Sequence, residues 1–569
     1  MERKTINKVQ RLVTVCLGFC LLSLLPSMVS AQPGWTSKAV KSIFTLKTFS
    51  ADGSLLGSTN GFFVSEEGDA VSCFTPFAGA VRAVVIDATG KEMPVVCMMG
   101  ANEMYDVAKF RVAGKKFQPL PLATRNANTN EAVWLLPYSV NAKKPVPTAG
   151  SVNKAETFQE SYAYYTVRMQ MPENTVGCPL LNGEGEVLGL MQQQARQGDT
   201  LSYAISAQFI ADMKISGLSL NDAALKKTRI KLAMPDDRDE AILMMYMAGT
   251  ALDSIGYASI IEDFIAKFPR AEEGYINRAQ LEATGNNFAA ADRDMREAIN
   301  VSDPKDNAHF TFSRLIYQKE VYRNNIPFAD WSLDKAAEEA KAAYAIQPLP
   351  AYKHLLAQIL FTQQKYDDAL TVFNELTGTE LKGAEIYYET ARCYEMKGDT
   401  TAMLALLDSA VNVYSKPYLK EAAPYIWARA IARMSAGKYR PAVQDMNEYE
   451  KLIATGLNAE FYYIREQAEL GGKQFQQALD DITKATQLAP QDPTYFAEKA
   501  SLEVRFGMND EAIKSARECI RLAPADSDGY LFLGLALCQK GNKTEGLPQL
   551  QKAKELGNEQ AEALIARYQ

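Results

Sequence analysis

The sequence KQFQQALDDITKATQLAP at residues 473–490 is repeated, in degenerate form, as GMNDEAIKSARECIRLAP at residues 507–524, with a period of 34 residues. The same period relates small residues and prolines in this part of the chain, namely Ala478, Ala512 and Gly546, and Pro490 and Pro524. Small residues at a fixed position let two helices approach closely, and a proline beyond the second helix ends it. The stretch therefore predicts helix pairs stacked into a solenoid.

An aromatic residue followed three positions later by alanine marks the start of other second helices upstream, at Phe288, Tyr366 and Tyr439. These segments resemble the tetratricopeptide repeat, a helix-pair module of about 34 residues. The spacing upstream varies more than in the last repeats. We expect eight or nine helix pairs from residue 239 to 556, a capping helix over 559–568, and an all-α solenoid domain over 239–569. The resemblance implies a concave face that binds peptides or partner helices.

The first half of the chain has the pattern of a β protein. Short apolar, β-branched and aromatic runs alternate with turn residues such as Gly, Asn and Asp between about residues 42 and 215. The expected strands are 43–49, 61–64, 70–74, 81–87, 95–99, 107–112, 132–138, 164–169, 187–191 and 202–205. Many short strands at even spacing predict an all-β barrel or sandwich, closed by one short helix over about 207–214.

Three stretches of this half resemble the chymotrypsin-like serine proteases, in particular their bacterial trypsin-like or HtrA-type branch. GSTNGFFVSEEGDAVSCFT (57–75) is similar to the segment that ends on the catalytic histidine, and NEMYDVAKF (102–110) to the segment with the catalytic aspartate. NTVGCPLLN (174–182), followed by GEVLGL (185–190), is similar to the segment with the nucleophilic serine. The resemblance implies a trypsin-like double β-barrel over residues 38–216.

Most catalytic residues of that family are replaced in this sequence. The resemblance places Thr75 at the histidine position, Asp106 at the aspartate, Val176 at the serine and Asn174 at the first oxyanion-loop glycine. A valine side chain has no nucleophile, and a threonine hydroxyl does not accept a proton at neutral pH. The loss of the glycine also puts the oxyanion donors in doubt. We therefore expect a pseudoprotease that keeps only Asp106 of the triad, in a structural role.

The histidine count supports this interpretation. The sequence has two histidines, His309 and His354, so the β-rich half contains none. An alignment shifted by one residue places Thr175 at the nucleophile position, and Cys178 is a further possible nucleophile. Neither has a histidine in its own domain to activate it. The alternatives are a divergent protease to which the repeats deliver substrates, and an inhibitor that competes with an active relative.

Six of the eight cysteines lie beyond residue 31, and they form no CxxC or Cys/His spacing. We therefore expect no metal site and no cofactor. Cys73 and Cys178 each lie two residues from a catalytic position, so the resemblance places them near each other. They are either buried free thiols or, in an oxidising compartment, a disulfide.

Residues 1–31 have the composition of a secretory signal. Basic residues precede an apolar run from residue 12 to about 25, and Val29-Ser30-Ala31 forms a small-residue cleavage signature before Gln32. We expect export to the bacterial periplasm, the cell envelope or the medium, with cleavage after Ala31; an uncleaved anchor is the alternative. No later segment is long and apolar enough to cross a bilayer. Residues 217–238 are interpreted as a charged, partly helical linker.

The formal net charge is −7, and it becomes −10 when residues 1–31, with four basic side chains and one acidic, are removed. An acidic chain is a poor partner for nucleic acids and for anionic membranes. The sequence therefore predicts an exported, non-catalytic scaffold that binds protein or peptide partners through the concave face of the repeats. The degenerate protease cleft is a second candidate site for peptides, held by backbone hydrogen bonds.

Overall fold

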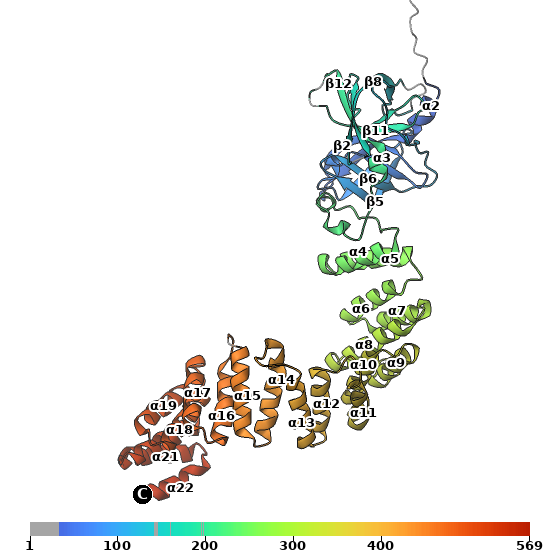
Figure 1. Cartoon of the computed structure of the whole chain (residues 1–569). Coiled ribbons are helices and arrows are strands. Elements are labelled where there is room, and N and C mark those ends of the chain that lie inside the picture. The colour runs from blue at the N-terminus through green and yellow to red at the C-terminus, as the bar shows by residue number, and fades with distance from the viewer. Residues whose placement is uncertain (1–32, 142–145, 160, 195, 197, 454) are drawn as a thin grey trace, which may run out of the picture. The chain divides into compact units, whose positions relative to one another are not determined.

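A computed structural model describes residues 33–569, except 142–145, 160, 195, 197 and 454 (Figure 1). The described chain divides into two compact units, with the boundary between Asp294 and Met295. The expected signal segment, residues 1–31, lies outside the described residues. Within the described part of the chain, no helix combines the length and apolar character needed to span a bilayer.

The first unit begins with two closed antiparallel barrels of six strands each. The first barrel has the strand order β1-β2-β3-β6-β5-β4, with β1 Ile43–Phe49, β2 Leu55–Phe63, β3 Asp69–Ser72, β4 Arg82–Ile86, β5 Glu92–Asn102 and β6 Val107–Val112. The second has the order β10-β11-β12-β9-β8-β7, with β7 Ala132–Leu135, β8 Thr148–Phe158, β9 Tyr162–Arg168, β10 Pro179–Leu181, β11 Val187–Met191 and β12 Leu201–Ser206. The expected double barrel is confirmed.

Two of these twelve strands, β8 and β10, are absent from the sequence prediction. In β8 only Val152 is buried, so the strand lacks the clear alternation of apolar and polar residues that marks a half-buried strand. Strand β10 has three residues, all of them buried, and is too short to stand out as an apolar run. Both are held by their neighbours: β8 pairs with β7 and β9, and β10 pairs with β7 and β11.

The alternation of side chains along β1 builds two cores at once. Phe44 packs inside the first barrel, where its ring centroid is 4.9 Å from that of Phe63 and 6.1 Å from that of Phe110. Its neighbour Ile43 points the other way and belongs to the core that includes Val133 and Leu180 of the second barrel. The barrels are therefore joined through a shared apolar interface, and this interface fixes the walls of any cleft between them.

The segment expected to be a linker packs on the first barrel. After the short helix α3 (Ala207–Ala211), residues 217–238 form two 3₁₀ turns, η3 (Ser219–Asn221) and η4 (Leu225–Lys227). Leu225 and Ile230 are buried in the core of the first barrel. The backbone of Met98 in β5 donates to the Lys231 carbonyl and accepts from the Ala233 amide, each at 2.8 Å. Much of this segment therefore packs against the first barrel as part of its wall.

The rest of the chain is helical. The helices of the first unit are α4 Arg238–Ala251, α5 Ser254–Lys267, α6 Glu272–Thr284 and the start of α7 Phe288–Val301. The second unit continues with α8 Asp306–Tyr322, α9 Leu333–Ile346, α10 Pro350–Thr362, α11 Tyr366–Leu376, α12 Ala384–Met396, α13 Thr400–Asn412, α14 Ala423–Ser435, α15 Tyr439–Leu452, α16 Ala459–Gly471, α17 Phe475–Leu488, α18 Pro493–Arg505, α19 Asn509–Leu522, α20 Ser527–Gln539, α21 Lys543–Glu555 and α22 Glu559–Tyr568. Taken two at a time, α4 to α21 make nine pairs in the described chain, and α22 follows them.

The packing explains the period of 34 residues. Ala478 and Ala512 are fully buried at the starts of α17 and α19. At Gly546, the equivalent position of α21, a Cβ atom would lie 2.5 Å from the Cys538 sulfur. Only a small side chain fits where the second helix of a pair crosses the first, and this restriction preserves the pattern.

Candidate functional site

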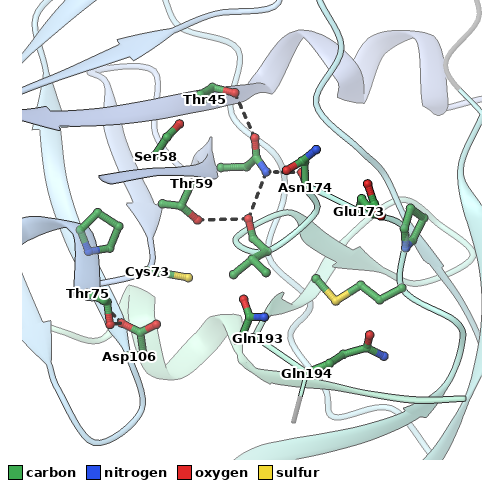
Figure 2. A pocket seen from close by; sticks show the side chains of 15 residues that line it. Thr45, Ser58, Thr59, Cys73, Thr75, Asp106, Glu173, Asn174, Gln193 and Gln194 are labelled. Atoms are coloured by element: carbon green, nitrogen blue, oxygen red, sulfur yellow. Dashed lines mark hydrogen bonds between the residues drawn. The ribbon is translucent and has the colours of Figure 1, made fainter. Parts of the chain in front are cut away.

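A cleft of about 810 Å³ contains the positions that the protease resemblance singles out. Both barrels contribute to its walls, and Figure 2 shows the side chains that line it. The lining residues are Thr45, Ser58, Thr59, Asn60, Cys73, Thr75, Pro76, Asp106, Met171, Pro172, Glu173, Asn174, Val176, Gln193 and Gln194. The structure thus brings Thr75, Asp106, Val176, Asn174 and Cys73 together, although they come from segments far apart in the sequence.

Thr75 and Asp106 lie next to each other on one side of the cleft (Figure 2). The Thr75 amide donates to Asp106 Oδ1 at 2.6 Å, and the Thr75 hydroxyl donates to the same oxygen at 2.8 Å. Asp106 has a positive φ of 48°, and its carboxylate lies at the start of the 3₁₀ turn η2 (Thr75–Phe77). In an active protease, the carboxylate of this aspartate orients the catalytic imidazole. Here it accepts two hydrogen bonds from Thr75, the residue at the imidazole position.

The loop opposite is held by a residue that the sequence did not reveal as important, Asn60 of β2. Its side-chain amide donates to the Asn174 carbonyl at 2.7 Å and to the Val176 carbonyl at 3.1 Å. Its backbone amide also donates to the Val176 carbonyl, at 3.2 Å. Thr45 donates to the Asn60 side-chain oxygen at 3.0 Å, which fixes the orientation of the amide group. Asn60 therefore joins the first barrel to the loop before β10 of the second.

Thr175, the nucleophile position of the shifted alignment, is turned away from the cleft. The Thr175 hydroxyl donates to the Pro172 carbonyl at 2.6 Å, and Thr175 is 2% exposed. Thr175 is also absent from the cleft lining within the described chain. The shifted alignment consequently places a buried, hydrogen-bonded hydroxyl at the nucleophile position.

Cys73 lines the cleft, and Cys178, the last residue of the loop before β10, is buried. All six cysteines of the described chain are free thiols. Burial raises the pKa of the Cys178 thiol to about 12. Burial, and next the negative charge of Asp106, raise the pKa of Cys73 well above the usual range. Both sulfurs are therefore protonated at neutral pH and are poor nucleophiles.

The two histidines lie in the helical region. His309 belongs to α8 and contacts Glu339 of α9, with 2.5 Å between Nδ1 and the carboxylate. His354 belongs to α10 and contacts Glu389 of α12, with 2.5 Å between Nε2 and the carboxylate. Each ring is mostly buried and is held by an acidic side chain of another helix.

Comparison with known protein families agrees with both parts of the fold. Residues 59–190 match the trypsin-like peptidase domain, and residues 354–419 and 498–561 match the tetratricopeptide repeat. The chain carries a trypsin-like peptidase domain followed by tetratricopeptide repeats. The first match contains Thr75, Asp106 and Val176, the positions of the catalytic triad in the protease resemblance.

Individual relatives cover only parts of the chain. Small glutamine-rich tetratricopeptide repeat-containing protein 2 of Mycosarcoma maydis is 28% identical over 116 residues, which is 20% of this chain and 30% of that protein. The E3 ubiquitin-protein ligase CHIP of Arabidopsis thaliana is 32% identical over 85 residues, 15% of this chain and 31% of that protein. The chain thus spans about a third of the length of the curated relatives it matches.

Among solved structures, the active form of the Rv3671c protease from M. tuberculosis is 19% identical, with a TM-score of 0.28. The match covers 33% of this chain and 85% of the protease chain. The HtrA-type protease AlgW with a tripeptide is 17% identical, with a TM-score of 0.27, and the match covers 31% of this chain and 60% of that one.

Proposed function

We propose that this protein is an exported, non-catalytic protein-binding protein, in which the trypsin-like domain is a pseudoprotease and the repeats bind protein partners. The observation that carries the proposal is the identity of the residues at the catalytic positions of the cleft. Thr75 and Val176 stand at the histidine and serine positions, and Asp106 is occupied by two hydrogen bonds from Thr75. With no histidine before residue 309, the trypsin-like domain has no general base of the kind its family uses.

The cleft retains features that suit peptide binding. Its volume of about 810 Å³ is of the size that holds several residues of an extended chain. Gln193 and Gln194 lie in it, in the segment that follows strand β11 (Figure 2). The Gln194 side chain donates to the Leu201 carbonyl and to the Ser202 hydroxyl, so it is held by the neighbouring strand. The Gln193 side chain makes no hydrogen bond to another described residue, and we propose that it is available to a peptide.

The absence of proteolysis is tested with the full mature chain. We expect no hydrolysis of casein and no covalent labelling by a fluorophosphonate probe, with trypsin as the positive control. Labelling that disappears in Thr175→Ala would instead establish a divergent protease.

Peptide binding in the cleft is tested with a peptide array and two matched variants. Gln193→Trp places a large side chain in the cleft, whereas Gln208→Trp places it on the exposed face of α3, away from the cleft. We expect the full chain to bind extended peptides, Gln193→Trp to lose this binding, and Gln208→Trp to keep it. If both variants bind as the wild type does, the peptides are bound elsewhere and the cleft has no such role.

Export is tested by amino-terminal sequencing of protein recovered from the envelope fraction. The small-residue signature before Gln32 gives Gln32 as the expected first residue. A first residue of Met1 would favour the uncleaved anchor, and recovery in the cytoplasm would contradict the proposed location.

A further inference from the structure

Three potential metal ligands meet between two helices of the second unit. His354 comes from α10, and Glu385 and Glu389 come from α12. One nitrogen of the imidazole and one oxygen of each carboxylate all lie within 4.8 Å of one another. Glu385 and Glu389 are four residues apart on the same helix, so their side chains project from one face, toward His354.

Surrounding side chains fix two of the three groups. Gln358, one turn after His354 on α10, donates to Glu389 Oε1 at 2.7 Å, which leaves Oε2 directed at His354 Nε2. The Phe373 ring packs edge-on to the imidazole, with centroids 6.3 Å apart. Such second-layer contacts orient the ligands of metal sites and limit the reorganisation needed on binding. The His354 and Glu389 side chains are 17% and 20% exposed, so the cluster is sheltered but open to an ion.

The other histidine provides an internal comparison. His309 also contacts a carboxylate, that of Glu339, but there the third group is the ammonium of Lys335, 2.6 Å from Glu339. A cation already balances Glu339 at that place. At His354 the third group is a second carboxylate, so the imidazole faces two acidic groups in place of one acidic and one basic group. The two clusters therefore differ in the property that decides whether a divalent cation is attracted.

We propose that His354, Glu385 and Glu389 form a binding site for a divalent transition-metal ion of the Zn²⁺ type. One imidazole and two carboxylates are a ligand set that Zn²⁺ accepts, with one coordination position left for water or for a group of a partner. Tetrahedral coordination separates ligand atoms by about 3.4 Å, so the three groups need to move by roughly 1 Å to enclose the ion. Such a site would connect α10 to α12. The proposed metal site does not depend on whether the cleft of the trypsin-like domain is catalytic or binds peptides.

The experiment is isothermal titration of the metal-stripped full chain with Zn²⁺, compared with three variants. Glu385 is exposed, so Glu385→Gln removes a ligand without disturbing the packing. We expect the wild type to bind one equivalent of Zn²⁺ with micromolar affinity or better. In Glu385→Gln and Glu389→Gln the affinity should fall by at least about tenfold. The matched control His309→Gln should bind like the wild type.

A thermal unfolding series gives a second measurement. Because a ligand that binds the folded state stabilises it, Zn²⁺ should raise the Tm of the wild type and of His309→Gln, but not that of Glu385→Gln. Either of two results would overturn the proposal. One is the absence of Zn²⁺ binding by the wild type, which would leave His354 as an ion-pair partner of Glu389. The other is equal binding by all four proteins, which would mean an adventitious ion only.

Discussion

At the scale of single residues, the cleft is shaped by the contact between Asn60 and Gly177. Gly177 has a φ of 81°, and a Cβ atom there would lie 2.1 Å from the Asn60 carbonyl oxygen. The same Asn60 holds the carbonyls of Asn174 and Val176. A side chain at position 177 would therefore push apart the two backbone segments that the Asn60 amide joins.

We predict that Gly177→Ala destabilises the trypsin-like domain by about 2 kcal/mol or more, since it combines an unfavourable backbone conformation with a steric clash. Calorimetric unfolding of the full chain measures the effect. Gly53→Ala is the control, because Gly53 has a similar φ of 85° but nothing within 4 Å of an added Cβ. Gly53→Ala should lower the free energy of unfolding by only about 1 kcal/mol. Equal losses in the two variants would show that the contact with Asn60 contributes nothing.

At the scale of the helices, an arginine joins three consecutive helices in three different repeats. Each arginine makes a bidentate pair with an aspartate 16 residues later, on the second helix of its own pair, and its third nitrogen reaches an acidic residue on the preceding helix. The sets are Arg278 with Asp294 and Glu262, Arg429 with Asp445 and Asp408, and Arg465 with Asp481 and Glu450. We call each of these arginine-centred sets of ion pairs a clasp. The clasps fix the orientation of successive helices, because the planar guanidinium has donors in set directions.

We predict that Asp481→Ala destabilises the repeats around α16 by about 3 kcal/mol, because it leaves Arg465, which is mostly buried, without its bidentate partner. Hydrogen exchange should show the loss of protection in α16 and α17 first, and then in the adjacent helices, since solenoid repeats are stabilised by their nearest neighbours. Asp480→Ala, a substitution of the exposed neighbouring aspartate, is the control and should leave exchange unchanged. Unchanged protection in Asp481→Ala would mean that Glu450 alone suffices.

Helix α16 also contains two carboxyls whose pKa values are raised. Glu466 and Glu469 are 0% and 3% exposed, and each has a carboxylate oxygen without a hydrogen-bond partner in the described chain. Burial raises the pKa of each from 4.5 to about 8, and the negative charges of Glu498 and Asp481 add to the effect at Glu466 and Glu469 respectively. At neutral pH the folded protein therefore holds these protons.

The sign of the pH dependence follows from this difference in pKa. Below about pH 4.5 both carboxyls are protonated in the folded and the unfolded state. Between pH 4.5 and 8 only the folded state keeps the protons, so the free energy of unfolding falls as the pH rises through this window. We predict that Glu466→Gln flattens the fall in Tm between pH 5.5 and 8.5, whereas Glu460→Gln, at an exposed position of the same helix, follows the wild type. Parallel curves for all three proteins would contradict the prediction.

At the scale of the whole molecule, local sequence patterns predicted the architecture because the same packing contacts recur along the chain. Small residues 34 positions apart revealed the repeats, since each lies buried where two helices cross. Alternating apolar residues revealed most strands, but not β8, whose exposed face carries no such signal. The cleft positions Thr75, Asp106 and Val176 came from the motif resemblance, and the structure places them around one cavity.

What the sequence did not predict depends on contacts between distant segments. Asn60 lies 114 residues before Asn174, and nothing in its local sequence indicates a bond to that loop. The cluster of His354, Glu385 and Glu389 joins two helices that are not consecutive, so no ligand spacing reveals it. The clasps are an intermediate case. An arginine followed 16 residues later by an aspartate, repeated in three helix pairs, is a signal that a repeat-by-repeat alignment could have found.

The thiols test the fold and the proposed export in one measurement. Burial raises the pKa of Cys178 to about 12 and those of Cys393 and Cys519 to about 11, so almost no thiolate exists at pH 8. We predict that the native protein reacts with a thiol reagent through Cys97 first, because Cys97 is the only half-buried cysteine of the described chain. The others should react at least about 100-fold more slowly than in denaturant. Cys97→Ser should lose the fast phase.

In denaturant without reductant, the exported protein should titrate six thiols, and Cys97→Ser should titrate five. A count of four that reductant restores to six would establish a disulfide, and Cys73 with Cys178 would be its expected members. A count of eight would mean that residues 1–31, with Cys16 and Cys20, are still attached. Six thiols that survive export to an oxidising compartment would indicate that burial, and not the redox environment, sets the state of these cysteines, because a thiol that cannot ionise does not enter exchange.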